Sequence, residues 1–250
     1  MAINVNTVYQ TVLLILNKEQ RGYMTPDEFN RVASQVQLEI FERYFDDLNQ
    51  QLRIPQTDTD YSDRQMNIDE KIAIFKTFGK CAYTASLRSF ALPTIDFYGQ
   101  TPEFYRLGAV VYRDETELQR LQRSDFYNIQ KSPLTKSTIS FPTYLYENQR
   151  LFIKPDSIKQ DVTADYVRKP LDVRWGYEPG TLGQYQYTGD DSIYDPAANP
   201  NGSTQFELHI SEQSSVVIDI LMYAGIIIRD PQIVQAAAQE AVMNEQNSKM

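Results

Sequence analysis

Residues 141–170, FPTYLYENQRLFIKPDSIKQDVTADYVRKP, carry the strongest strand signal in the chain. Pro142 and Pro155 bracket two apolar-rich runs joined by Asn148-Gln149, and proline marks strand ends because it cannot donate to a β ladder. The pattern predicts a β-hairpin whose register is set by a two-residue turn. The expected cross-strand pairs are Tyr144 with Ile153, Leu145 with Phe152, Tyr146 with Leu151, and Glu147 with Arg150.

The same stretch continues into a third predicted strand at residues 162–167, ended by Lys169-Pro170. The three strands would form an antiparallel meander. Gln149 is a less favourable second turn residue than glycine, so a looser turn is an open alternative. Because the stretch contains no histidine, cysteine or glycine, it is typical of a packing surface rather than of a catalytic site.

The N-terminal residues predict two helices. The first follows a cap at Asn6 or Thr7 and ends at Arg21-Gly22. The second begins at Thr25-Pro26-Asp27-Glu28, a capping box with proline at the first helical position. Apolar residues then recur every three or four positions, so we expect the two helices to pack as an antiparallel pair. The buried face of the second helix should comprise Phe29, Val32, Ala33, Val36, Ile40, Tyr44 and Leu48.

The C-terminal part predicts a short strand followed by two more helices. The strand covers residues 206–210 and includes the lone His209, whose apolar neighbours favour a hydrogen-bonded structural role. Residues 212–229 are apolar nearly all round, which requires burial either in this chain's own bundle or against another subunit. A slim, alanine-rich helix then begins at Asp230-Pro231 and contains Ile233 and Val234.

Shorter elements fill the middle of the chain. Residues 68–78 predict a short helix ended by Gly79, and strand-like runs follow at residues 83–93 and 109–112. A brief helix containing Phe126 precedes the hairpin. The overall prediction is an α+β fold, in which N- and C-terminal helices form a bundle around a central β-rich insertion with an antiparallel meander. The predicted domains are a helical pair at 1–65, the insertion at 66–210 with a long loop at 171–203, and the bundle-completing helices at 211–250.

Charge is spread unevenly along the sequence. Residues 1–60 contain 5 basic and 9 acidic side chains, residues 61–170 contain 16 and 13, and residues 171–250 contain 3 and 11. The middle is therefore mildly basic, whereas the C-terminal part is strongly acidic. The two regions could pair between neighbouring copies or could simply be solvated surface, and neither has the basic stripe of a dedicated nucleic-acid binder.

The loop at residues 171–203 is rich in aromatic residues, which favours docking over disorder. Docking on the same chain and docking on a neighbouring copy are both open. Asp190 and Asp191 could act as an acid–base pair, but no histidine or metal motif accompanies them, so a solvated loop is the preferred interpretation. The aromatic candidates are Trp175, Tyr177, Tyr185, Tyr187 and Tyr194.

Sequence motifs for chemistry are lacking. There is no glycine-rich phosphate loop, nucleophile elbow or zinc motif, and one cysteine and one histidine leave little for a metal or a triad. Asp58, Asp60 and Asp63 lack the glycine and terminal glutamate of a calcium loop. We expect no cofactor, no metal and no enzymatic activity. The N-terminus predicts no signal peptide and the longest apolar run is too short for a membrane span, so we expect no membrane partner.

The order of these features resembles the head-to-tail connector proteins (adaptor or tail ring proteins) of short-tailed bacteriophages, most closely those of the crAss-like group. The similar segments span nearly the whole chain. They are LNKEQRGYMTPDEFN (residues 16–30), LPTIDFYG (92–99), SDFYNIQKSPLTK (124–136), FPTYLYENQRLFIKP (141–155) and FELHISEQSSVVIDILMYAGIIIRDPQIVQAAAQEA (206–241). Residues 176–203 match no part of the pattern.

This resemblance implies a structural virion protein, assembled in the host cytoplasm and located at the portal–tail junction. About twelve copies would form a ring that joins the portal to the tail and continues the DNA exit channel, with DNA passing the lumen during ejection without specific binding. The expected partners are further copies, the portal protein and adjacent tail or ring proteins. Candidate interface residues are Tyr144, Tyr146 and Phe152 of the hairpin, the five aromatic loop residues, and Ile233 and Val234, whose helix would insert along the portal.

Two other classes of function stay open. A minor capsid or fibre-attachment protein would show the same lack of chemical motifs. A small hydrolase would use loop carboxylates around Asp190. A monomer whose activity disappears in Asp190→Asn would indicate the hydrolase, whereas a discrete multimer would indicate the connector.

Overall fold

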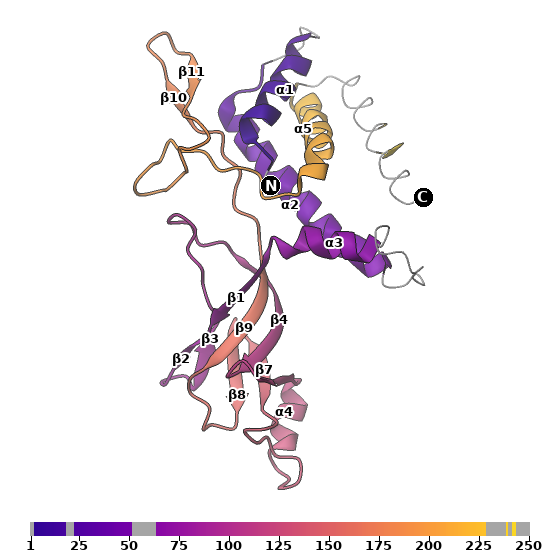
Figure 1. Cartoon of the computed structure of the whole chain (residues 1–250), viewed down its shortest axis with the longest axis vertical. Helices are drawn as coiled ribbons and strands as arrows, with labels where there is room; N and C mark the ends of the chain where they lie inside the picture. Colours follow the sequence, from indigo (N-terminus) through magenta and orange to yellow (C-terminus); the bar gives the residue numbers. More distant parts are fainter. Residues whose placement is uncertain (1–2, 19–22, 52–63, 229–238, 240–241, 244–250) are drawn as a thin grey trace. The chain divides into compact units, whose positions relative to one another are not determined.

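The computed structural model describes residues 3–18, 23–51, 64–228, 239 and 242–243. These residues form helices and mainly antiparallel strands, an α+β chain as predicted (Figure 1). The chain divides into two compact units: a helical unit of Met1–Ile74, Tyr98–Gln100 and Pro170–Met250, and a barrel unit of Phe75–Phe97 and Thr101–Lys169. The barrel unit is shorter than the predicted insertion at 66–210, because residues that follow Lys169 hydrogen-bond to α2 of the helical unit.

The helical unit is built from α1 (Val5–Lys18), α2 (Pro26–Gln51), α3 (Arg64–Ala73) and α5 (Gln213–Ile228), which is preceded by the 3-10 helix η1 (Ile210–Glu212). α5 lies beside α1 and α2 (Figure 1). It packs against each of them more extensively than α1 and α2 pack on each other. The predicted antiparallel pair is therefore a three-helix arrangement, because the apolar α5 covers both apolar stripes. Its buried residues include Val8, Val12, Leu16, Phe29, Val36, Ile40, Val216 and Ile220.

The capping box of α2 is confirmed. The Thr25 backbone N–H donates to Glu28 Oε2 at 2.9 Å, and the Glu28 N–H donates to Thr25 Oγ1 at 3.4 Å. These reciprocal bonds satisfy two backbone donors that the first helical turn would otherwise leave open. The bonds from Thr25 also lower the pKa of the Glu28 carboxyl.

The predicted hairpin is confirmed with its register. β7 (Thr143–Glu147) pairs with β8 (Arg150–Lys154) through all four expected pairs. The turn residues Asn148 and Gln149 both have positive φ, 50° and 56°, as a two-residue type I′ turn requires. The twist of this turn matches the twist of the strands, so the tight turn persists without a glycine.

The predicted meander is wrong. β9 (Val162–Arg168) does not extend the hairpin but lies between β1 (Lys76–Lys80) and β4 (Phe104–Tyr112) in a second sheet. The connection after β8 contains Ile158, which is buried in the core between the sheets. Because Ile158 and alternate residues of β9 are buried in the same core, β9 faces the hairpin across that core.

The two sheets of the barrel unit share both edges. Their strand orders are β1-β9-β4-β5 and β2-β3-β8-β7-β6, with β2 at Ala82–Thr84, β3 at Ser89–Ala91, β5 at Thr116–Glu117 and β6 at Gln119–Arg120. β1 passes into β2 at Cys81, and β5 passes into β6 at Leu118; both residues are buried in the core. The unit is thus a small barrel, a closure that protects strand edges from unwanted pairing.

Local differences from the sequence prediction have clear causes. The helix expected to reach residue 78 ends at Ala73, and β1 follows. Gly79 lies inside β1, where a Cβ atom would be 2.6 Å from Pro93 Cβ, so this glycine permits close packing instead of ending a helix. The predicted strand at 206–210 is reduced to a single bridge between Ile3 and Phe206. The predicted brief helix is α4 (Arg123–Ile129), and the long loop contains a hairpin of β10 (Tyr177–Pro179) and β11 (Tyr185–Tyr187).

Asp219 is a buried carboxyl on the mainly apolar α5. Its Oδ2 lies 3.4 Å from Arg43 Nη2, yet burial raises the pKa of Asp219 above its ordinary value of 3.8. A raised pKa means that folding favours the protonated form, so this contribution to stability is complete below 3.8 and is lost as pH rises through the folded-state pKa. Ionised Asp219 therefore opposes folding at neutral pH.

We expect Asp219→Asn to raise the melting temperature at pH 7 by a few degrees, with the gain shrinking towards acidic pH. Thermal unfolding followed by circular dichroism across this pH range measures the effect. Asp191→Asn, at an exposed loop carboxylate, controls for the loss of one charge. A lower melting temperature of Asp219→Asn at pH 7 would mean that the ion pair with Arg43 outweighs the cost of burial.

Candidate interaction surfaces

The candidate residues of the hairpin are mainly structural. Tyr144 is buried in the barrel core, and burial raises the pKa of its hydroxyl. Tyr146 is half-buried, with its ring 6.2 Å from that of Phe104 and the Arg120 guanidinium 5.5 Å above it. Phe152 is also half-buried. These three side chains hold the barrel together and offer little free surface.

Trp175 docks on its own chain, which is the first of the two alternatives that the sequence left open. Its indole Nε1 donates to Asn6 Oδ1 of α1 at 3.1 Å, and its backbone N–H donates to Asn30 Oδ1 of α2 at 2.7 Å. The ring packs on Tyr9 at a centroid distance of 4.6 Å. Trp175 therefore fastens the chain after the barrel unit onto two helices of the helical unit.

The other loop tyrosines extend from this anchor. Trp175 stacks on Tyr187 at 5.3 Å and on Tyr177 at 5.9 Å, and Tyr177 meets Tyr185 edge-on at 5.0 Å. Tyr194 lies under the Arg174 guanidinium at 4.4 Å. The stacked rings support the β10–β11 hairpin, so most of the aromatic candidates stabilise the fold of the helical unit.

The outer end of this array forms a surface that we call the acidic tyrosine patch: Tyr23, Asp27, Glu28, Tyr177 and Tyr185. Tyr23 is 56% and Tyr185 40% exposed, and burial together with the electrostatic influence of both raises the pKa of Tyr9. The Tyr177 hydroxyl donates to Asp27 Oδ1 at 3.2 Å. Both carboxylates of the patch are exposed. Flat, amphipathic rings beside exposed carboxylates suit a partner with apolar and basic side chains.

A second surface was missed by the sequence prediction. We call residues 130–142, between α4 and β7, the α4 loop. Leu134 is 96% and Phe141 79% exposed, and Ile139 and the preceding Tyr127 are more than half exposed. Exposed apolar side chains at this density are typical of interaction sites. A sequence signal was available, because three bulky apolar residues stand in a polar segment that contains two prolines.

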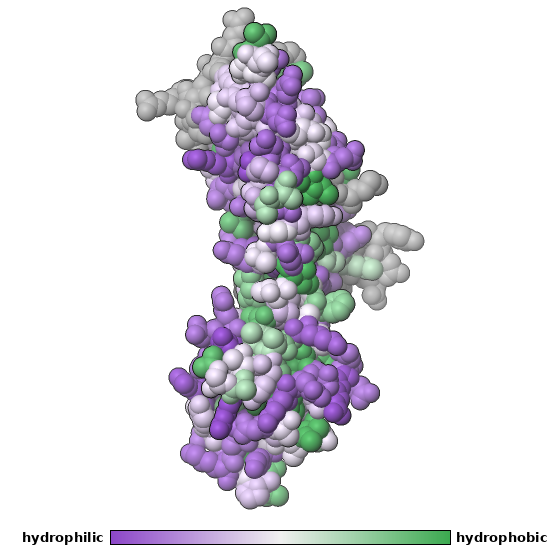
Figure 2. Space-filling model, turned by 90° about the vertical axis from the view of Figure 1, so that its left-hand side faces the viewer, coloured by the Kyte–Doolittle hydropathy of each residue, from purple (hydrophilic) through white to green (hydrophobic). Residues whose placement is uncertain are grey.

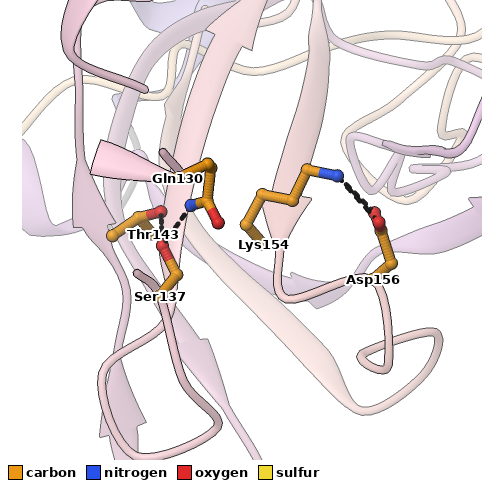
Figure 3. Close-up of polar contacts among 5 residues, drawn as sticks. All are labelled: Gln130, Ser137, Thr143, Lys154 and Asp156. Atoms are coloured by element: carbon orange, nitrogen blue, oxygen red, sulfur yellow. Dashed lines mark hydrogen bonds and ion pairs between the residues drawn. The ribbon is translucent and has the colours of Figure 1, made fainter. Parts of the chain in front are cut away.

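Hydrogen bonds hold the α4 loop in place despite its apolar exterior. Gln130 Nε2 donates to Ser137 Oγ at 2.6 Å, and Ser137 Oγ lies 2.6 Å from Thr143 Oγ1 at the start of β7 (Figure 3). Ser137 and Thr143 are buried. The loop is thereby fixed to the barrel before any partner binds, which lowers the entropy lost on binding. Lys154, which pairs with Thr143 from the end of β8, contacts Asp156 Oδ1 through its Nζ at 2.7 Å (Figure 3).

The two units differ in charge. The barrel unit contains 14 basic and 10 acidic side chains, whereas the helical unit contains 10 basic and 23 acidic side chains. On the side drawn in Figure 2, hydrophobic residues form green patches among purple hydrophilic ones. Arg123, Lys131 and Lys136 are exposed in and beside the α4 loop, so the loop combines apolar tips with basic flanks.

The helical unit contains a cleft of about 640 Å³. Its lining includes Asp27, Arg31, Ser34 and Arg174 but no histidine or cysteine. The Ser34 hydroxyl donates to the Asn30 carbonyl at 2.8 Å and accepts from the Val173 N–H at 3.0 Å. These bonds join α2 to the segment around Val173, and among the described residues no carboxylate or imidazole hydrogen-bonds to the Ser34 hydroxyl.

Other chemistry-bearing residues also have structural partners. His209 Nδ1 accepts from the Ser211 N–H at 3.3 Å and caps η1, consistent with the expected structural role. The Tyr187 hydroxyl donates to Asp190 Oδ1 at 2.6 Å, and this bond lowers the pKa of Asp190. Within the described residues, no group of three or more His, Cys, Asp or Glu side chains could hold a metal ion.

Some sequence predictions concern residues outside the described ones. These are the acidic segment with Asp58, Asp60 and Asp63, and the C-terminal helix with Ile233 and Val234. Among the helices of the described residues, none combines the length and apolar character needed to cross a membrane. In comparisons with known proteins, no protein-family model matches the chain, and no curated protein matches it.

Proposed function

We propose that this protein is a structural virion subunit that forms a ring of about twelve copies between portal and tail and continues the DNA exit channel. In this proposal the helices from both chain ends form one bundle, and the barrel unit is an insertion into that bundle. The barrel unit and the aromatic array would contact neighbouring copies and tail or ring proteins. The C-terminal residues, including Ile233 and Val234, would contact the portal.

This proposal rests on a contrast between polar side chains that form internal hydrogen bonds and apolar side chains that are exposed. The polar groups that could perform chemistry, Ser34, Asp190 and His209, are engaged in local structural hydrogen bonds. Bulky apolar groups, by contrast, stand exposed on the preformed α4 loop. This distribution favours assembly over catalysis.

The acidic helical unit supports the channel role. If its carboxylates line the lumen, they repel the DNA phosphates and release no counterions on contact. DNA would then slide through without specific binding. The carboxylate hydrolase is less well supported, because the lowered pKa of Asp190 makes it a weak base, although one still able to accept a hydrogen bond.

Native mass spectrometry of the protein, alone and mixed with the portal protein of the same virion, tests the proposal. We expect one discrete closed oligomer near twelve copies, or joint assembly with the portal. Negative-stain electron microscopy of the same mixture should show rings with a central channel. A chain that stays monomeric in every mixture, and whose hydrolytic activity disappears in Asp190→Asn, would instead identify the hydrolase.

A further inference from the structure

We infer that the α4 loop of one copy docks on the acidic tyrosine patch of a second copy. This inference rests on the proposed function, because it identifies the surfaces through which copies would assemble. The contact joins two different surfaces, so it is heterologous: each copy offers one loop and one patch. Such contacts close into a ring when the rotation between copies permits it.

The loop has the features of a docking element. Leu134 is almost fully exposed and Phe141 is mostly exposed. Their loop is held by the bonds among Gln130, Ser137 and Thr143 (Figure 3). A partner can bury these side chains without first ordering the loop. Burial of two large apolar side chains at the centre of a contact, with charged residues around them, is enough to anchor it.

The patch offers complementary chemistry. Tyrosine rings accept aliphatic and aromatic side chains on their faces and stay stable in water when no partner is present. Asp27 and Glu28 lie beside the rings and are exposed, although each also accepts a hydrogen bond within its own copy. These carboxylates can pair with Lys131 or Lys136 of an incoming loop. Two basic residues, Arg31 and Arg174, line the cleft beside Asp27. The negative field at the patch therefore depends on the excess of carboxylates in the whole helical unit.

Charge favours a second copy over other occupants. The loop belongs to the basic unit, so two loops would repel each other, and the strongly acidic helical unit supplies the opposite sign. An anionic lipid surface is less suitable, because the chain has a net charge of −9 and its helical unit would be repelled. The acidic unit of another copy therefore fits the loop best.

Sedimentation velocity of the full chain over a wide concentration range tests the contact. We expect Leu134→Asp, Lys136→Asp and Asp27→Lys each to weaken association by about tenfold or more. Leu134 and Lys136 are exposed, so their variants should keep the melting temperature of the wild type. Asp27→Asn keeps an oxygen for the Tyr177 hydroxyl and should weaken association less, which guards against a folding defect in Asp27→Lys. Leu87→Asp, at another exposed apolar residue of the barrel unit, is the matched control and should assemble normally.

Charge exchange gives the decisive result. An equimolar mixture of Lys136→Asp and Asp27→Lys should assemble again, because every loop can then face a patch of opposite charge in an alternating arrangement. If the wild type assembles and all the loop and patch variants assemble equally well, the inference is overturned while the proposed function stands. If the wild type remains monomeric with and without portal, both are overturned. Flotation with phosphatidylglycerol vesicles that is lost in Leu134→Asp, while assembly is unchanged, would assign the loop to lipid and also overturn the inference.

Discussion

Trp175→Ala is expected to lower the free energy of unfolding by about 3–5 kcal/mol, the usual cost of truncating a buried large aromatic residue. Trp175 is only 6% exposed, and its ring contacts Tyr9, Tyr177 and Tyr187. The substitution also leaves the Asn6 side chain without its indole donor. Urea unfolding followed by circular dichroism measures the change, because Trp175 is the single tryptophan and the variant has no indole fluorescence.

Leu182→Ala provides the matched control for Trp175. Leu182 lies in the β10–β11 hairpin that follows Trp175 but is 87% exposed, so its loss should change the free energy of unfolding by less than about 0.5 kcal/mol. Trp175→Phe should fall between the two, since it keeps most of the stacking but loses the Asn6 bond. A loss below about 1 kcal/mol for Trp175→Ala would show that the aromatic array does not fasten this segment to the helices.

Phe90→Ala should cost about 3–5 kcal/mol in the barrel unit. Phe90 is 1% exposed, belongs to the core between the two sheets, and packs on Tyr83 at 5.0 Å. Its backbone also pairs with Leu151 of the β7–β8 hairpin. Removing the ring leaves a cavity where both sheets meet, and the short strands around it have little freedom to collapse.

Chemical unfolding with two probes separates the effect of Phe90→Ala from a general loss of stability. Circular dichroism reports the whole chain, whereas the fluorescence of Trp175 reports the helical unit. Leu87→Ala, at a 53% exposed residue between β2 and β3, should unfold like the wild type by both probes. If Phe90→Ala were as stable as Leu87→Ala, the two sheets could not share the single core that closes the barrel.

Burial also makes Cys81 unreactive in the native barrel. Desolvation raises the pKa of its thiol to about 11, so very little thiolate exists near neutral pH. The position of Cys81 explains the burial, since it lies where one strand passes from the first sheet to the second. The only cysteine of the chain therefore serves as a small apolar core residue.

The sequence by itself determined the features that depend on nearby residues. The register of β7 and β8 follows from an alternating pattern and a two-residue turn, and the start of α2 follows from Thr25, Pro26 and Glu28. Alternation also identified β9 as a strand. Sterics and hydrogen bonds within a few residues decide such features, so they can be predicted from a short window.

Only the tertiary structure decided which surfaces meet. β9 could have continued the hairpin or faced it, and its pairing with β1 places partners more than eighty positions apart in the chain. Trp175 is buried because Tyr9, far away in the sequence, packs on its ring, whereas Leu134 is exposed because nothing in the described part of its unit covers it. Both are bulky apolar residues in loops, and composition cannot distinguish them. Burial depends on contacts between distant segments, which is why the aromatic candidates are mainly structural and the α4 loop emerged only from the fold.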